Sequence, residues 1–131
     1  MAMPLIKILE DNAALVWKHL QALYPRLNKY PVPEVVANNR LWRTAGLAWC
    51  EDHRVEFAAK FFGKYRHEML AVIVPHELAH IADYIMHGAQ ASIIDGGHGK
   101  TWQKIMHSCN LPGDKYHTFI IAKNEPAIKY L

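Results

Sequence analysis

Two histidines lie four residues apart in His76-Glu77-Leu78-Ala79-His80, and a glutamate directly follows the first of them. On an α-helix, positions 76 and 80 share one face, about 40° apart around the axis. Two imidazoles placed in this way can bind one Zn²⁺, and Glu77 then lies beside the open position of the metal, where it can accept a proton from water. The pattern is typical of the core of a metallopeptidase.

Apolar residues surround this motif and predict that its helix is buried. Residues 69–74 are all apolar, and an apolar helical face continues through Leu78, Ala79, Ile81, Ala82 and Ile85. The alternative is a chance pattern on a structural helix. A buried charged glutamate flanked by two histidines is costly unless something pairs with it, and a metal ion would satisfy all three side chains.

A hydrolytic zinc site normally has three protein ligands, so a third ligand must come from elsewhere in the chain. The candidates downstream are Asp83, His87, His98, His107 and His117. His87 lies on the same helical stripe, but seven residues correspond to about 10.5 Å along the axis, too far to share a metal with His80. Asp83 is expected to be either a hydrogen-bond acceptor behind the ligands or a solvated surface charge.

His98 is the preferred third ligand. It lies in Asp95-Gly96-Gly97-His98-Gly99-Lys100, and a glycine-rich turn of this kind can reverse the chain toward the first helix. The alternative for His98 is a turn residue exposed to water. The next residues, 101–106, predict a second helix with Trp102, Ile105 and Met106 on one face.

Four segments, in this order, resemble the SprT-like zinc metalloproteases, a family that includes bacterial SprT proteins and Spartan-type DNA–protein crosslink proteases. The segments are Arg43-Thr44-Ala45-Gly46, Val74-Pro75-His76-Glu77-Leu78-Ala79-His80, Gly97-His98-Gly99-Lys100-Thr101-Trp102 and Tyr116-His117-Thr118-Phe119. The resemblance extends from about Asn12 to Phe119. It implies a metalloendopeptidase that acts on proteins bound or crosslinked to DNA, with single-stranded DNA as a further candidate partner.

The same resemblance assigns roles to individual residues. His76, His80 and His98 bind one Zn²⁺, and Glu77 is the general base. The last motif places His117 and Tyr116 near the site, as candidates to stabilise the oxyanion. The alternative for His117 is a strand residue that makes an ordinary hydrogen bond. Because the chain stops at Leu131 without a Cys-x-x-Cys pair, we expect a minimal version that lacks the C-terminal zinc ribbon.

Composition predicts one domain, residues 1–131, in the cytoplasm. The chain has 131 residues, of which 51% are hydrophobic, enough for one packed core. Cys50 and Cys109 fit reduced thiols better than a disulfide framework. We expect no membrane partner, because no apolar run reaches bilayer length and the N-terminus lacks signal-peptide features. The formal charge of +3 permits contact with nucleic acid without requiring it. Oligomeric state is not predicted.

Local patterns predict an α+β fold, a small zincin-like metalloprotease domain whose short antiparallel sheet packs on the HExxH helix. Pro75 either kinks that helix or begins its metal-binding part. The other expected elements are a helix capped by Asp11-Asn12 and ending near Tyr24, a strand over 34–37, a hairpin of 41–50 with 54–58, a loop over 110–115 and an edge strand over 117–122.

Two other functions stay open at this point. One is a narrow-specificity zinc hydrolase that acts independently of DNA. The other is a non-catalytic, zinc-stabilised DNA-binding module, which a fourth ligand at His117 would favour, since structural zinc sites are usually closed by four ligands. Aromatic and basic residues also alternate in Asn39-Arg40-Leu41-Trp42-Arg43. They could stack on single-stranded nucleic acid, but a core tryptophan flanked by surface arginines is the preferred interpretation.

Overall fold

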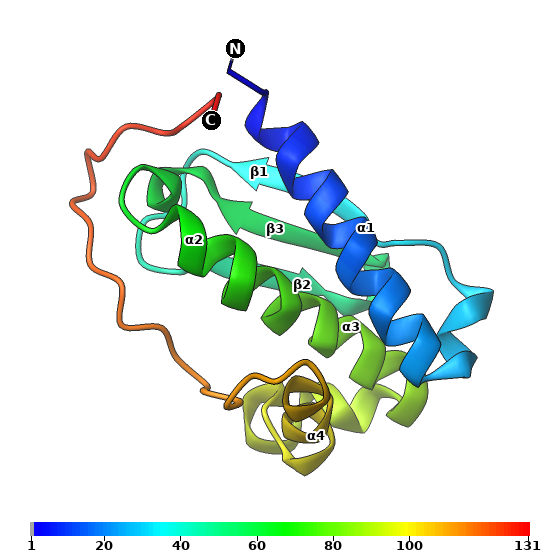
Figure 1. Ribbon diagram of the computed structural model, residues 1–131. Helices are drawn as coiled ribbons and strands as arrows, with labels where there is room; N and C mark the ends of the chain where they lie inside the picture. Colours follow the sequence, from blue (N-terminus) through cyan, green and yellow to red (C-terminus); the bar gives the residue numbers. More distant parts are fainter. Residues whose placement is uncertain (1) are drawn as a thin grey trace.

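A three-stranded sheet forms one layer of the protein, seen in a computed structural model that describes residues 2–131 (Figure 1). The strands are β1 (Glu34–Asn38), β2 (Gly46–Trp49) and β3 (Arg54–Ala58), in the order β1-β3-β2. The predicted hairpin is confirmed, since β2 pairs antiparallel with β3 across a short turn, but its first strand begins at Gly46 and not at Leu41. β1, however, pairs parallel with β3, so the prediction of an antiparallel sheet is wrong for this pair. The reason is that the sequence pattern locates strands but leaves their partners and directions open.

Helix α1 (Leu5–Leu23) packs against β1 and begins earlier than predicted. Its buried residues are Leu5, Leu9, Ala13, Trp17 and Leu20. This spacing of three and four residues continues N-terminally past Asp11-Asn12, which lie inside the helix instead of capping it. The helix follows Pro4 directly and ends just before Pro25.

The motif His76-Glu77-Leu78-Ala79-His80 lies on the last part of a continuous helical run. This run consists of α2 (Arg66–Glu68), a π-helical turn (Met69–Ile73) and α3 (Val74–His87). Pro75 is the second residue of α3 and lies inside the continuous run, so its missing N–H falls directly after the irregular backbone of the π-helical turn. The π-helical turn directly before it is the kind of irregularity often found at functional sites. Figure 1 shows α1 and this run on the same face of the sheet, with α3 against β2.

The sequence predicted reduced cysteines and no apolar run of bilayer length, and only the first prediction agrees with the structure. Cys50 and Cys109 are both free, as predicted. The prediction that no apolar run reaches bilayer length is wrong, because the run Arg66–His87 is 22 residues long with a mean hydropathy of 1.2 in its most apolar window, enough by length and composition to span a membrane. In this structure, 61% of that window is buried inside the protein, as in a core helix.

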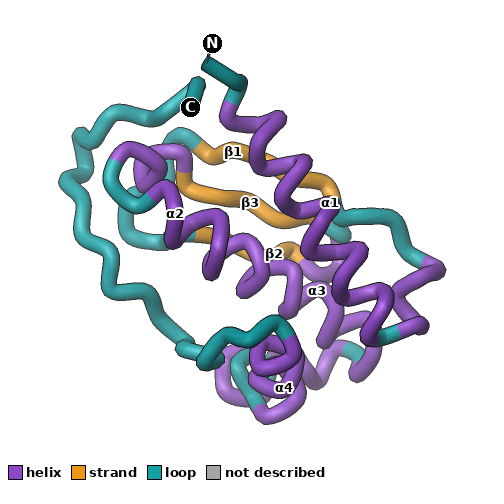
Figure 2. Tube along the Cα trace, in the orientation of Figure 1, coloured by secondary structure: helices purple, strands orange, loops and turns teal. Residues whose placement is uncertain are grey.

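The C-terminal part of the chain contains α4 (Lys100–Ser108), as predicted, followed by a long irregular segment. Figure 2 shows this segment running along the outside of the molecule from α4 back to the N-terminus. The strand predicted over 117–122 does not form, because the segment's polar groups bond to other elements instead of a ladder. Its anchors are the Tyr65 hydroxyl, which contacts the backbone of Ile120, and the Ala59 carbonyl, which accepts from the Ile128 N–H at 3.2 Å.

Candidate metal centre

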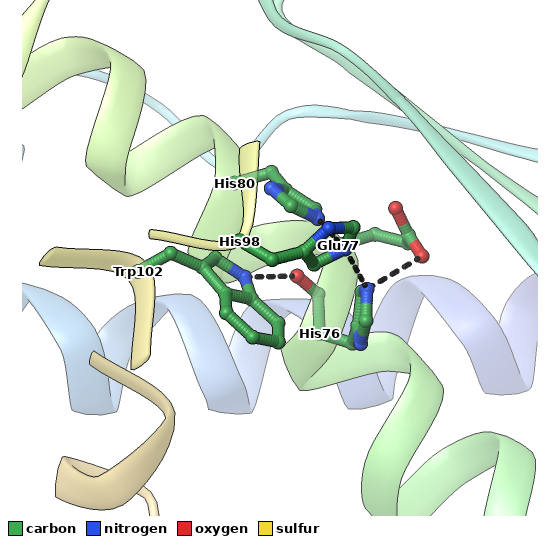
Figure 3. Close-up of polar contacts among 5 residues, drawn as sticks. All are labelled: His76, Glu77, His80, His98 and Trp102. Atoms are coloured by element: carbon green, nitrogen blue, oxygen red, sulfur yellow. Dashed lines mark hydrogen bonds and ion pairs between the residues drawn. The ribbon is translucent and has the colours of Figure 1, made fainter. Parts of the chain in front are cut away.

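Three imidazoles converge at the face of α3 that points toward α4 (Figure 3). The Nε2 atom of His98 lies 3.2 Å from the Nε2 atom of His76 and 3.2 Å from that of His80. A tetrahedral zinc ion with Zn–N bonds of about 2.0–2.1 Å holds its nitrogens about 3.3 Å apart. The three residues that the sequence singled out as ligands therefore lie together, with their ligand atoms within 4.8 Å of one another and His98 at zinc-ligand separation from both partners.

The glycine-rich turn brings His98 to the helix through an unusual backbone. Asp95, Gly96 and Gly97 all have positive φ values, of 50°, 63° and 84°. Gly97 also packs against His80, since a Cβ at this position would lie 3.3 Å from the His80 Cε1 and Nδ1 atoms. Glycine is needed here for both the left-handed conformation and the close approach. The predicted chain-reversing turn is present.

Trp102 forms an aromatic wall behind the three imidazoles. It is fully buried, it stacks on His80 with ring centroids 5.2 Å apart, and it meets His76 and His98 edge-on at 4.7 Å each. Its indole N–H donates to the His76 carbonyl at 3.3 Å. Sequence reasoning treated Trp102 only as a core residue of the second helix. No direct signal of this contact was present in the sequence, because His98 lies in the turn before α4 and Trp102 lies on α4.

Burial keeps the three imidazoles neutral. It lowers the pKa of His76 to about 4, with a further contribution from the neighbouring His98 and His117. It likewise lowers the pKa of His80 to about 3, and it is the main cause of the lowered pKa of His98. A backbone hydrogen bond with Gly97 acts to raise the pKa of His80, and one with Asp95 acts to raise the pKa of His98, but burial outweighs both. At neutral pH all three rings are therefore uncharged, which is the form that binds a metal ion.

Glu77 is buried beside this trio. Its Oε2 atom lies 3.8 Å from the Nε2 atom of His76 (Figure 3), and burial raises the pKa of its carboxyl group to about 8. At pH 7, without a metal, this carboxyl is mostly protonated and His76 is neutral, so the contact is not an ion pair. A carboxyl whose pKa is shifted this far, next to three metal-ligand side chains, is the combination expected of a functional site.

The raised pKa of Glu77 predicts a pH-dependent difference in stability between the metal-free wild type and Glu77→Gln. The pKa rises from 4.5 to about 8 on folding, so between these values the folded protein holds a proton that the unfolded chain releases. Stability from this group is therefore lost as the pH rises toward 8. Between about pH 5.5 and 7.5, the wild type should lose about 2 kcal/mol of unfolding free energy relative to Glu77→Gln.

Urea unfolding with a chelator present, at both pH values, measures this difference. The histidines titrate in both proteins, so their contribution cancels in the comparison. A constant difference between the two proteins across this range would show that the Glu77 pKa is not raised in the folded state.

Asp83 and His87 lie apart from the metal trio. The Asp83 side chain is only 2% exposed, so it is not a solvated surface charge. Its Oδ1 atom lies 2.7 Å from His87 Nδ1, within the same helix. Asp83 therefore serves as a buried hydrogen-bond acceptor, and its partner is His87 instead of a metal ligand.

Tyr116 and His117 lie on the wall of a cleft of about 770 Å³ that opens beside the three histidines. The His117 Nδ1 atom accepts a hydrogen bond from the Phe119 N–H, so Nε2 carries the proton and donates to the Arg43 carbonyl at 2.7 Å. Tyr116 is 81% exposed, with its ring centroid 6.4 Å from that of His98. Both residues are at the site, and their roles toward an oxyanion stay predictions.

The segment Asn39-Arg40-Leu41-Trp42-Arg43 contains a cation–π contact between two of its own residues. The Arg43 guanidinium lies over the Trp42 ring, 4.5 Å from its centroid. Trp42 is half-buried against the hydrophobic core, and Arg43 is exposed at the edge of the cleft. This agrees with the preferred interpretation of a core tryptophan beside a surface arginine.

Comparison with known proteins identifies similar sequences. The family model described as the SprT-like family matches residues 15–121. The protein called Protein SprT in Salmonella arizonae is 32% identical over 96 residues, which cover 72% of this chain and 54% of that protein. Protein SprT of Pseudomonas syringae pv. syringae is 26% identical over 124 residues, covering 94% of this chain and 71% of that protein. The chain thus spans about half the length of the Salmonella relative. No solved structure matches it.

Proposed function

This chain belongs to the SprT-like family, and on that basis we propose that it is a zinc-dependent metalloendopeptidase. The observation that carries the proposal is the convergence of three imidazoles, with His98 Nε2 at zinc-ligand separation from the other two, and a buried carboxyl group at their side. A cleft of about 770 Å³ opens beside this group and has room for a segment of polypeptide.

In the proposed reaction, each side chain of the site has a separate role. His76, His80 and His98 hold the metal, and Trp102 fixes their orientation. When bound, Zn²⁺ supplies positive charge that acidifies a water molecule, polarises the scissile carbonyl and favours the ionised form of Glu77. Glu77 accepts the proton of the attacking water and passes it to the leaving amine. Tyr116 and His117, on the cleft wall, are the candidates to donate to the oxyanion.

The ligand set supports a catalytic zinc in preference to a structural one. Within residues 2–131, the only cluster of potential ligand side chains contains three members, whereas structural zinc sites usually have four. His117, the candidate fourth ligand, has its Nε2 committed to the Arg43 carbonyl. The missing fourth ligand would leave a coordination position open for water on the side of the cleft.

We further propose that the substrate is a protein bound or crosslinked to DNA, that single-stranded DNA is a partner, and that the protein acts in the cytoplasm. The resemblance to the SprT-like proteases supports this assignment. The formal charge of +3 is compatible with contact to a polyanion.

Cleavage of a DNA-binding protein by the zinc-loaded enzyme tests the proposal. We expect wild type to cleave at least about tenfold faster with single-stranded DNA than without it, because the DNA holds enzyme and substrate together and raises their effective concentration. Glu77→Gln should not cleave in either case. A substrate that does not bind DNA provides the matched control.

Each outcome of this assay discriminates between functions. Equal cleavage with and without DNA would keep the peptidase and remove the DNA partner, which favours a narrow-specificity hydrolase. Absence of cleavage by a protein shown to hold one zinc ion would contradict the peptidase proposal itself.

A further inference from the structure

Gly46, the first residue of β2, lies directly against the side chain of Glu77. A Cβ atom built on Gly46 would lie 2.8 Å from Glu77 Cγ, 3.0 Å from Glu77 Oε2 and 3.2 Å from the Glu56 carbonyl oxygen. The first distance is shorter than packed atoms tolerate, and the other two are tight. Gly46 does not have a positive φ, so its backbone conformation is open to any residue. Glycine is required here because a side chain would collide with its neighbours, although the backbone conformation would permit one.

A side chain at this position could displace only one of its two neighbours. On one side is the Glu56 carbonyl, which belongs to strand β3, paired with β2 along its whole length. On the other side is the Glu77 side chain, which hangs from α3 and has more freedom to turn than the sheet backbone does. Added volume at position 46 therefore pushes on the Glu77 carboxyl group.

We infer that Gly46 is a positioning residue for Glu77. Because Gly46 has no side chain, the Glu77 carboxyl group can occupy the space beside the start of β2. This inference rests on the proposed function, in which that carboxyl is the general base. Catalytic groups must be held within about 0.5 Å of their productive position. Relieving the overlap at Gly46→Ala requires a shift of about that size.

The first arm of the test compares Gly46→Ala with Gly63→Ala in the zinc-loaded enzyme. A Cβ on Gly63 would meet nothing closer than 3.7 Å and its φ is not positive, so Gly63→Ala is the matched control. Misplacement of a catalytic group by about 1 Å costs about 10²-fold in rate. For Gly46→Ala we expect kcat to fall at least about tenfold, with KM within about twofold and one zinc ion retained. An unchanged kcat would overturn the inference.

The second arm needs no enzymatic activity. The melting temperature of the metal-free protein is measured for Gly46→Ala in the wild type and in a Glu77→Ala background, where the side chain that the new methyl group meets is gone. We expect a loss of about 4 °C or more in the wild type and less than half of that in Glu77→Ala. Folding of Gly46→Ala only in the Glu77→Ala background would support the same coupling. Equal losses in both backgrounds would overturn the inference.

The two arms separate failure of this inference from failure of the proposed function. If the wild type does not hydrolyse peptides while Gly46 and Glu77 are coupled in the melting experiment, the proposed function has failed and the contact stands. If the wild type is active and the coupling is absent, Gly46 does not position Glu77.

Discussion

Replacing Glu77 with glutamine is expected to lower kcat/KM for peptide hydrolysis about 10³-fold while leaving one zinc ion per chain. Glutamine has nearly the same shape as glutamate but cannot accept the proton of the attacking water. It keeps the buried contact beside His76, whose Nε2 atom lies 3.8 Å from the carboxyl oxygen, and it does not touch the ligand set. Steady-state kinetics together with a zinc assay on the purified variant measure both parts of this expectation.

Glu68 provides the control for that substitution. It lines the same cleft as Glu77, but it lies on α2 and outside the ligand cluster. Glu68→Gln removes one carboxylate from the cleft and should change kcat/KM by less than about fivefold. If the two variants lose activity to the same extent, charge in the cleft matters and Glu77 has no special role. A Glu77→Gln enzyme with more than a tenth of wild-type activity would contradict the assignment of the general base.

The convergence of the three histidines could be predicted because most of the information for it is local. His76 and His80 meet through the pitch of one helix, and the turn that carries His98 is built from glycines whose positive φ values the sequence already suggests. Each piece depends on neighbouring residues alone. The one long-range step, bringing His98 back to α3, followed from the need for a third ligand.

The parts that sequence reasoning missed depend on long-range packing. The parallel pairing of β1 with β3 is a property of the whole sheet, and no residue within β1 encodes its partner. The predicted strand at 117–122 had a suitable composition, but it pairs with neither edge strand, β1 or β2, and its groups bond instead to Tyr65 and Arg43. Trp102 contacts all three ligands only because α4 packs on α3.

Long-range packing also determines the pKa of the buried Glu77 carboxyl group. The sequence predicted Glu77 as the general base but did not predict its raised pKa, which comes from burial beneath the start of β2. Gly46 lies 31 positions before Glu77 in the chain. The contact between them is visible only after the sheet has formed against α3.

Removing the His98 imidazole should weaken zinc binding at least about 10²-fold. Changes in the groups that merely support a metal ligand typically cost 10- to 100-fold in affinity, so loss of a ligand should cost no less. The His98 ring is nearly equidistant from its two partners, with Nε2 separations of 3.2 Å to each, so it closes the ligand triangle. Competition with a chelator of known affinity measures the effect in His98→Ala.

His117→Ala is the matched variant, because it removes an imidazole from the same cleft without removing a predicted ligand. Its zinc affinity should stay within about threefold of wild type, since the Nε2 atom of His117 donates to the Arg43 carbonyl. Equal losses of zinc in the two variants would make His117 a fourth ligand. The site would then be closed, as structural zinc sites are, and the protein would have to be a zinc-stabilised module instead of a peptidase. A large loss in His98→Ala alone would keep a coordination position open for water, which the proposed hydrolysis requires.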